Sequence, residues 1–194
     1  MSLQDLHKHK NFPDLETEHL FLRQMTFDDI DFVYNEFSDP MITQYLMDEP
    51  PLTNRDEARD IIQFYSDPET KTHNRWVLVR KIDNQTIGTC GFHKWDKRYF
   101  RAEIGYDMLP QFWGHGYMKE ALEVVLANGF QQMELNRIDA LVAIENKRSL
   151  SLLNRLGFQQ EGLLRDYFYL DGKFYDHFLL SLLKRDWHKN KIQG

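Results

Sequence analysis

The chain has 194 residues, of which 42% are hydrophobic and 14% aromatic, so it is long and apolar enough for one globular domain with a substantial core. Its formal net charge of −6 disfavours a general nucleic-acid-binding protein and is compatible with a cationic substrate. The single cysteine, Cys90, excludes an internal disulfide framework, and we expect it to be a buried filler in a strand rather than a nucleophile. No apolar run reaches about 18 residues and no secretory signal is recognisable, so we expect no membrane partner and a cytoplasmic location.

The pattern of apolar residues divides the chain into a leader, one domain and a tail. We expect residues 1–14 to be a polar leader, residues 15–188 the domain and residues 189–194 the tail. Alternating and helical spacings predict the elements within the domain. The predicted strands are 20–25, 75–82, 86–95, 98–109, 137–144, 162–170 and 174–183, and the predicted helices are 27–37, one from Thr53 to Tyr65, 116–134 and 147–156. The expected fold class is α/β (α+β), with about 7 strands in a central mixed, mostly antiparallel sheet and about four flanking helices.

The stretch Pro110–Tyr117, between a predicted strand and a predicted long helix, carries the strongest local signal. Gly114 and Gly116 are separated by one residue, which lets the backbone turn tightly and approach a ligand. The following helix start offers unpaired N–H groups and the positive end of the helix dipole. This arrangement suits a pyrophosphate.

Three ordered motifs together resemble the GNAT superfamily of N-acetyltransferases over residues 14–187. The first is Gln111-x-x-Gly114-x-Gly116, and the second runs from Asn146 through Gly157-Phe158 to Gly162. The third, Leu15 to Arg23, is similar to the Thr-Glu-Arg-Leu-x-Leu-Arg opening of the ribosomal-protein-alanine acetyltransferase branch. His19 departs from the usual Arg there, which puts a contact at that position in doubt. The resemblance implies a sheet that is splayed between the fourth and fifth strands, 98–109 and 137–144.

The resemblance also implies acetyl-CoA as the donor and a primary amine as the acceptor. Backbone groups near Tyr106 and Met108 would pair with the pantetheine arm, and a backbone N–H near Met108 would meet the oxyanion. Asn146 would bond the pantetheine amide, although it is also suited to cap its helix, and one role does not exclude the other. The residues implied around the pyrophosphate are Gln111, Trp113, Gly114, His115, Gly116, Tyr117 and Met118.

Glu103 is the first candidate for the general base, acting directly or through water. It lies among apolar residues on the strand before the loop, where burial would raise its pKa. The alternative is a structural carboxylate that pairs with Arg98 or Arg101. His93 is a weaker second candidate, for which a packed or solvated side chain is the favoured interpretation.

Ser149 is the candidate for protonating the leaving thiolate. Many relatives carry a Tyr seven residues after the Asn, but that position is Leu153 here, which has no proton to donate. Ser149 also follows Asn146 closely enough to lie near the sulfur, and it binds the cofactor in this interpretation. The alternative is that Ser149 is only a small residue that lets the cofactor pass.

The last predicted hairpin and the histidines complete the candidates. Tyr167, Tyr169 and Tyr175 either line the acceptor mouth or pack on the sheet. The eight histidines show no metal-ligand spacing, so no metal is assigned.

The expected function is therefore an acyltransferase, an acetyl-CoA-dependent N-acetyltransferase in which the amine attacks directly within a ternary complex. The expected acceptor is a protein N-terminal amine, as in ribosomal protein modification. The alternatives are a small-molecule amine (polyamine, amino acid or antibiotic) and a non-catalytic acyl-CoA-binding module. Leu153 argues mildly against the polyamine branch. No nucleic-acid partner is expected, and a homodimer stays open because dimers are common in the family.

Overall fold

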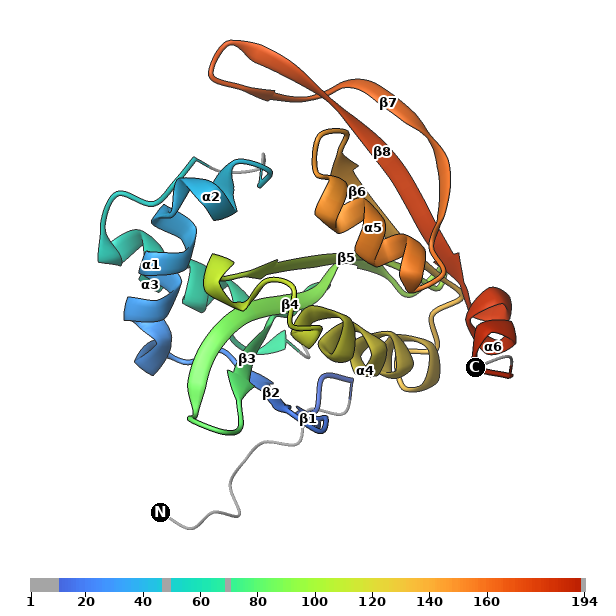
Figure 1. The fold of residues 1–194 in the computed structure, drawn as a ribbon, viewed down its shortest axis with the longest axis horizontal. Coiled ribbons are helices and arrows are strands. Elements are labelled where there is room, and N and C mark those ends of the chain that lie inside the picture. Colours follow the sequence, from blue (N-terminus) through green and yellow to red (C-terminus); the bar gives the residue numbers. More distant parts are fainter. Residues whose placement is uncertain (1–10, 47–49, 69–70, 193–194) are drawn as a thin grey trace.

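The computed structural model describes residues 11–46, 50–68 and 71–192 (Figure 1), so most of the predicted leader lies outside the described residues. The strands are β1 (Leu15–Glu16), β2 (Leu20–Gln24), β3 (Trp76–Arg80), β4 (Gln85–Asp96), β5 (Arg101–Met108), β6 (Arg137–Ala143), β7 (Gln159–Leu170) and β8 (Lys173–Leu183). The helices are α1 (Ile30–Ser38), α2 (Pro40–Thr43), α3 (Arg55–Tyr65), α4 (Tyr117–Gln131), α5 (Lys147–Arg155) and α6 (Lys184–Ile192), with 3-10 turns η1 (Phe27–Asp29) and η3 (Pro110–Phe112).

The strands form one sheet in the order β1-β2-β3-β4-β5-β6-β8-β7. Every neighbouring pair is antiparallel except β5 and β6, which are parallel because the α4 crossover connects them. Their pairing covers only Arg101–Glu103 against Arg137–Asp139. Beyond Glu103 the two strands diverge, and β6 leaves β5 together with the β7–β8 hairpin (Figure 1). The predicted fold class and the predicted splay are both confirmed.

Helices cover the two faces of the sheet and bury its apolar side chains. The larger core cluster joins the sheet to α4 through residues such as Leu122, Val125 and Phe130. A smaller cluster, which includes Val33 of α1 and Ile62 of α3, packs on the other face. The sheet between these layers therefore presents different side chains to α4 and α5 than to α1 and α3.

The structure adds packing that the sequence pattern missed. Phe12, inside the predicted leader, is fully buried and meets Trp76 and Trp95 edge to face. Helices α2 and α6 were not predicted; α6 docks by Trp187, whose ring lies 5.2 Å from that of Phe130. A four-residue helix and a helix held by one aromatic anchor give too little periodicity to detect. Within the described ranges, no helix is both long and apolar enough to span a bilayer.

Candidate active site

In the loop between β5 and α4, two glycines leave the backbone uncovered by side chains. Gly114 (φ +80°) and Gly116 (φ +87°) are in the left-handed region, which favours glycine. A Cβ at either position would meet no atom within 4 Å, so the loop borders open space. Gly116 caps the 15-residue helix α4 without a side-chain hydrogen bond, so the positive end of the helix dipole faces the loop. The loop therefore fits a pyrophosphate.

The other residues predicted around the loop lie on its flanks. Gln111 is exposed in η3, and the Nδ1–H of His115 donates to the Trp113 carbonyl (3.0 Å) while the ring stacks on Tyr117. Met118, by contrast, packs into the core. It follows that Met118 offers the loop only its backbone, as predicted for this stretch.

The backbone of β5 presents Tyr106 and Met108 to the splay. The N–H of Leu109 donates to the Ile87 carbonyl on β4 (3.0 Å). The backbone N–H and C=O groups of successive residues in a strand point to opposite edges of that strand. Tyr106 and Met108 thus direct their peptide groups to the edge that β6 has left. The indole N–H of Trp113 donates to the Met108 carbonyl (2.8 Å), which ties the loop to this edge. The N–H of Met108 and the N–H and C=O of Tyr106 point into the splay, as a pantetheine-binding strand requires.

Ser149 of α5 contacts β5, and Asn146 is the N-cap of the same helix. Asn146 Oδ1 accepts the Ser149 N–H (3.1 Å), so the predicted helix-capping role is present, and its amide nitrogen is not used by the cap. The Ser149 hydroxyl lies 2.7 Å from the hydroxyl of Tyr106. Burial raises the pKa of Tyr106, which keeps the phenol protonated. The Tyr106–Ser149 pair joins β5 to α5 across the splay, while Leu153 is fully buried.

Glu103 lies at the closed end of the splay, where the β5–β6 pairing stops. Its carboxylate pairs with Lys94 (3.0 Å) and its side chain is 24% exposed. The partner is thus Lys94, not Arg98 or Arg101. By strand alternation the Glu103 side chain is on the opposite face of β5 from Tyr106.

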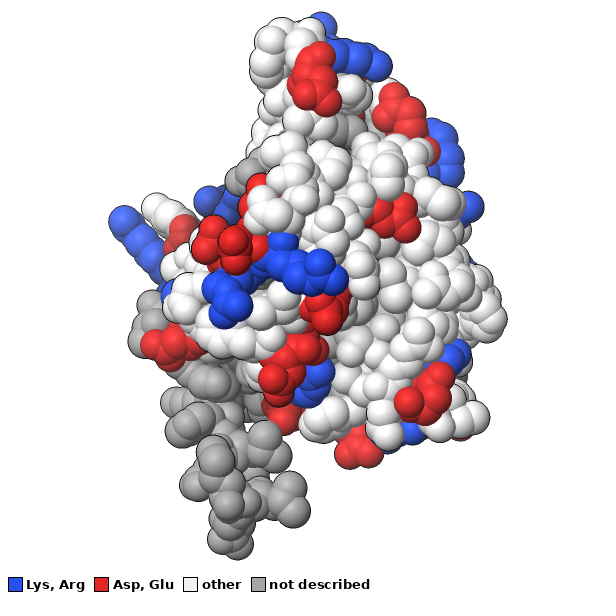
Figure 2. Space-filling view, turned by 90° about the vertical axis from the view of Figure 1, so that its left-hand side faces the viewer, with Lys and Arg blue, Asp and Glu red and all other residues white. Residues whose placement is uncertain are grey.

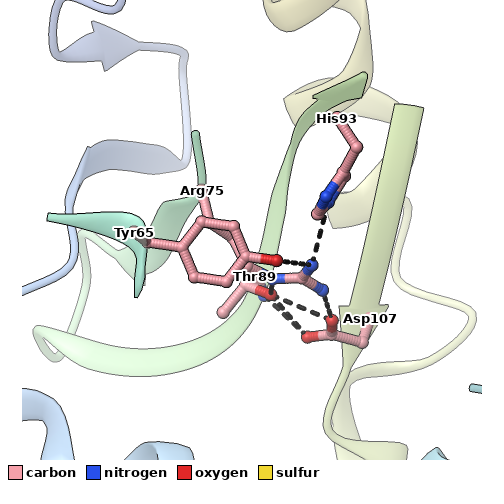
Figure 3. Close-up of polar contacts among 5 residues, drawn as sticks. All are labelled: Tyr65, Arg75, Thr89, His93 and Asp107. Atoms are coloured by element: carbon pink, nitrogen blue, oxygen red, sulfur yellow. Dashed lines mark hydrogen bonds and ion pairs between the residues drawn. The ribbon is translucent and has the colours of Figure 1, made fainter. Parts of the chain in front are cut away.

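Sequence reasoning missed a buried polar cluster on the Glu103 face of β5 (Figure 3). Arg75, which precedes β3, forms an ion pair with Asp107 of β5 and donates through Nε to the Thr89 hydroxyl of β4 (2.6 Å). That hydroxyl lies 2.8 Å from Asp107 Oδ1. The remaining guanidinium nitrogen approaches Tyr65 of α3 and His93, each at 3.4 Å. The only trace in the sequence is polar residues within otherwise apolar strands.

Two members of this region change their protonation because they are buried. Burial, with a contribution from the Arg75 charge, lowers the pKa of His93 to about 3, so His93 is a neutral acceptor for Arg75 and not a base at neutral pH. Burial and the neighbouring Asp107 carboxylate raise the pKa of Glu36 on α1 well above its usual range. The cluster therefore holds one compensated ion pair, a neutral imidazole and a neutral carboxylic acid.

The remaining candidates lie around the site. His19 retains a contact despite replacing the usual Arg, since its backbone N–H and Nδ1 both bond Glu120 of α4 (2.8 and 2.9 Å). Tyr167 and Tyr169 are exposed on the hairpin, and Tyr175 is half-buried. No group of three or more His, Cys, Asp or Glu side chains is arranged to hold a metal ion in the described part of the chain.

Residues 19–159 match the family model of the acetyltransferase (GNAT) domain. The uncharacterized N-acetyltransferase p20 of Bacillus licheniformis is 44% identical over 174 residues, which cover 89% of this chain and 97% of that protein. The ribosomal protein uS5-alanine N-acetyltransferase of Escherichia coli is 36% identical over 106 residues, 54% of this chain and 55% of that protein.

Among solved structures, spermidine N-acetyltransferase from Vibrio cholerae in complex with CoA and spermine has a similar fold. It superposes with a TM-score of 0.78 at 23% identity, over 88% of this chain and 98% of that one. The family match, the relative that aligns over nearly its whole length and the splayed sheet lead to one conclusion: the chain belongs to the GNAT family and is an acetyl-CoA-dependent N-acetyltransferase.

Proposed function

We propose that this enzyme acetylates a protein N-terminal amine by direct attack on the thioester within a ternary complex. The observation that carries the proposal is the placement of Glu103 and the Tyr106–Ser149 pair on opposite faces of β5 beside the splay. A thioester at that edge has a proton acceptor on one face and a proton donor on the other. The amine therefore attacks from one side and the CoA thiolate departs from the other, without a covalent enzyme intermediate.

Each residue has one task in this scheme. Glu103 accepts the proton of the attacking amine, directly or through water, and the Met108 N–H stabilises the oxyanion. Because the Tyr106 phenol stays protonated, it donates to Ser149 and leaves the serine proton to the departing sulfur. Cys90 takes no part, since it is fully buried and burial raises the pKa of its thiol.

The charges on the Glu103 side favour an α-amine over a polyamine. Of the buried carboxyl groups there, Asp107 is compensated by Arg75 and Glu36 is neutral. Figure 2 shows acidic and basic side chains interspersed over the side formed by α1 and α3, not an acidic surface that would attract a polycation. An α-amine titrates near 8, against about 10 for an alkyl amine, so a carboxylate that is 24% exposed, as Glu103 is, suffices as its base. The Escherichia coli relative is named for an alanine of a ribosomal protein, which agrees with this acceptor class.

Thiol release from acetyl-CoA with a panel of acceptors tests this proposal. The panel contains peptides with N-terminal Ala or Ser, the same peptides with a blocked N-terminus, spermidine and an aminoglycoside. We expect the highest kcat/KM for the free peptides, with mass spectrometry placing the acetyl group on the α-amine. Preference for spermidine would reassign the enzyme to small amines, and thiol release no faster than background with every amine would support a binding module.

Substitution of Gly116 by Val is expected to raise the Kd for acetyl-CoA about 10-fold or more. A β-branched residue strongly disfavours the left-handed φ of +87°, so the loop would turn its N–H groups away from the pyrophosphate. Isothermal titration calorimetry measures the Kd for acetyl-CoA. Gly162→Val is the matched control, because a Cβ there also meets open space but without a positive φ. Equal Kd values for the two variants would contradict the role of the loop.

Substitution of Tyr106 by Phe is expected to lower kcat by roughly as much as Ser149→Ala, about 10-fold, as for the loss of one hydrogen bond, while KM for acetyl-CoA changes little. Phe keeps the ring and removes only the hydroxyl that orients Ser149. The double variant should be no slower than Ser149→Ala, since both changes interrupt one donor chain. Additive losses in the double variant would show that the two hydroxyls act separately.

A further inference from the structure

We propose that Arg148 binds a phosphate group of the cofactor and thereby links the two halves of the splayed sheet. Arg148 lies in the first turn of α5, beside Asn146 and Ser149, and is exposed. Its guanidinium stacks over the indole of Trp113, 4.2 Å from the ring centroid. The proposal rests on acetyl-CoA binding to the glycine loop, and it assigns a residue that the loop motif does not contain.

The stacking holds the guanidinium beside the loop in a defined position. Trp113 is itself fixed, because its indole N–H donates to the Met108 carbonyl. A planar guanidinium stacked on an aromatic ring loses little further freedom when it binds a phosphate through its N–H fork. Arg148 is therefore preorganised next to Gly114 and the start of α4.

The charge of Arg148 is not compensated by the protein. Among the described residues, none of the carboxylates is in ion-pair distance of its guanidinium, in contrast to five other arginines: Arg23, Arg55, Arg75, Arg80 and Arg137. Glu120, the acidic residue in the first turn of α4, is held by His19. A phosphate that enters the loop thus meets an uncompensated cation from the α5 side as well as the helix dipole.

The consequence is a contact that spans the splay. The loop directly follows β5 in the chain, whereas Arg148 lies on α5, the helix that follows β6. A phosphate held by both closes the open end, just as the Tyr106–Ser149 pair bridges it further in. The bound cofactor then helps to hold Ser149 against Tyr106 of β5.

Calorimetry with CoA, dephospho-CoA and pantetheine tests the proposal on the full chain. We expect Arg148→Ala to raise the Kd for CoA about 10-fold. The control is Arg155→Ala, an exposed arginine in the last turn of the same helix whose Nε–H donates to the Ser151 carbonyl of its own helix; it should change the Kd less than twofold. If the loss persists with dephospho-CoA, Arg148 binds the pyrophosphate, and if it disappears, Arg148 binds the 3′-phosphate.

Two results would overturn the assignment. One is a Kd for CoA within twofold of wild type in Arg148→Ala. The other is an equal loss for pantetheine, which has no phosphate and would report a change in the fold instead. Failure of wild-type protein to bind CoA would be a separate result, because it would refute the loop as the cofactor site before Arg148 is considered.

Discussion

Substitution of Asp107 by Ala is expected to lower the free energy of unfolding by about 3–5 kcal/mol. The Asp107 and Arg75 side chains are 2% and 8% exposed, so removal of the carboxylate leaves a guanidinium without its counter-charge in a region shielded from solvent. The same carboxylate accepts from both the backbone and the hydroxyl of Thr89, and these donors also lose their partner. Urea unfolding followed by circular dichroism measures the change.

The matched control is Asp83→Ala, which breaks a pair between Asp83 and Arg80 at the surface. Exposed pairs contribute about 0–1 kcal/mol, so the control should stay close to wild type. A double variant, Arg75→Met with Asp107→Leu, should recover part of the stability because it leaves no charge unpaired. Equal losses for Asp107→Ala and Asp83→Ala would mean that the cluster does not anchor β5.

Substitution of Glu103 by Gln is expected to lower kcat about 100-fold at neutral pH. The amide has nearly the same shape and can still accept a hydrogen bond from Lys94, but it is no proton acceptor for the amine. The Kd for acetyl-CoA should remain unchanged because the side chain is on the face opposite to Ser149. Steady-state kinetics at neutral pH with a peptide acceptor give kcat, and isothermal titration calorimetry gives the Kd for acetyl-CoA.

Glu123→Gln is the control for this variant, since Glu123 of α4 is also paired with a lysine, Lys119, but lies at the surface away from the splay. A second variant, Lys94→Ala, separates the two roles of Glu103. If the carboxylate served only to hold Lys94, then Lys94→Ala would reproduce the loss. A wild-type kcat in Glu103→Gln would likewise assign Glu103 to structure.

The sequence was informative where function depends on local backbone. Gly114 and Gly116 are required by their own φ angles, and the Asp171-Gly172 hairpin turn also has two positive φ values. Such constraints act between neighbours in the chain, so they leave a pattern. The type and chain order of most elements could also be predicted, because each amphipathic segment must bury one face in a layered domain.

Contacts that depend on the register between strands could not be predicted from the sequence. Glu103 pairs with Lys94 because the register of β4 shifts between His93 and Asp96, where Lys94 adopts a φ of +50°. A bulge re-aims a side chain without any distinctive local composition. Arg75 and Asp107 likewise come into contact only when β3, β4 and β5 pair in the observed register. The spacing of residues along the chain does not predict that register.

The divergence of β5 from β6 also has a consequence for the fate of the protein in the cell. From Ile104 to Met108, β5 presents an edge that no neighbouring strand of the described chain completes, and such edges are where chains mispair. A cofactor arm that pairs along this edge acts as the missing strand. Its binding adds RT ln(1 + [L]/Kd) to the stability, about 2.7 kcal/mol at 100 times Kd. The supply of acetyl-CoA would then govern how long the enzyme survives proteolysis, besides how fast it works.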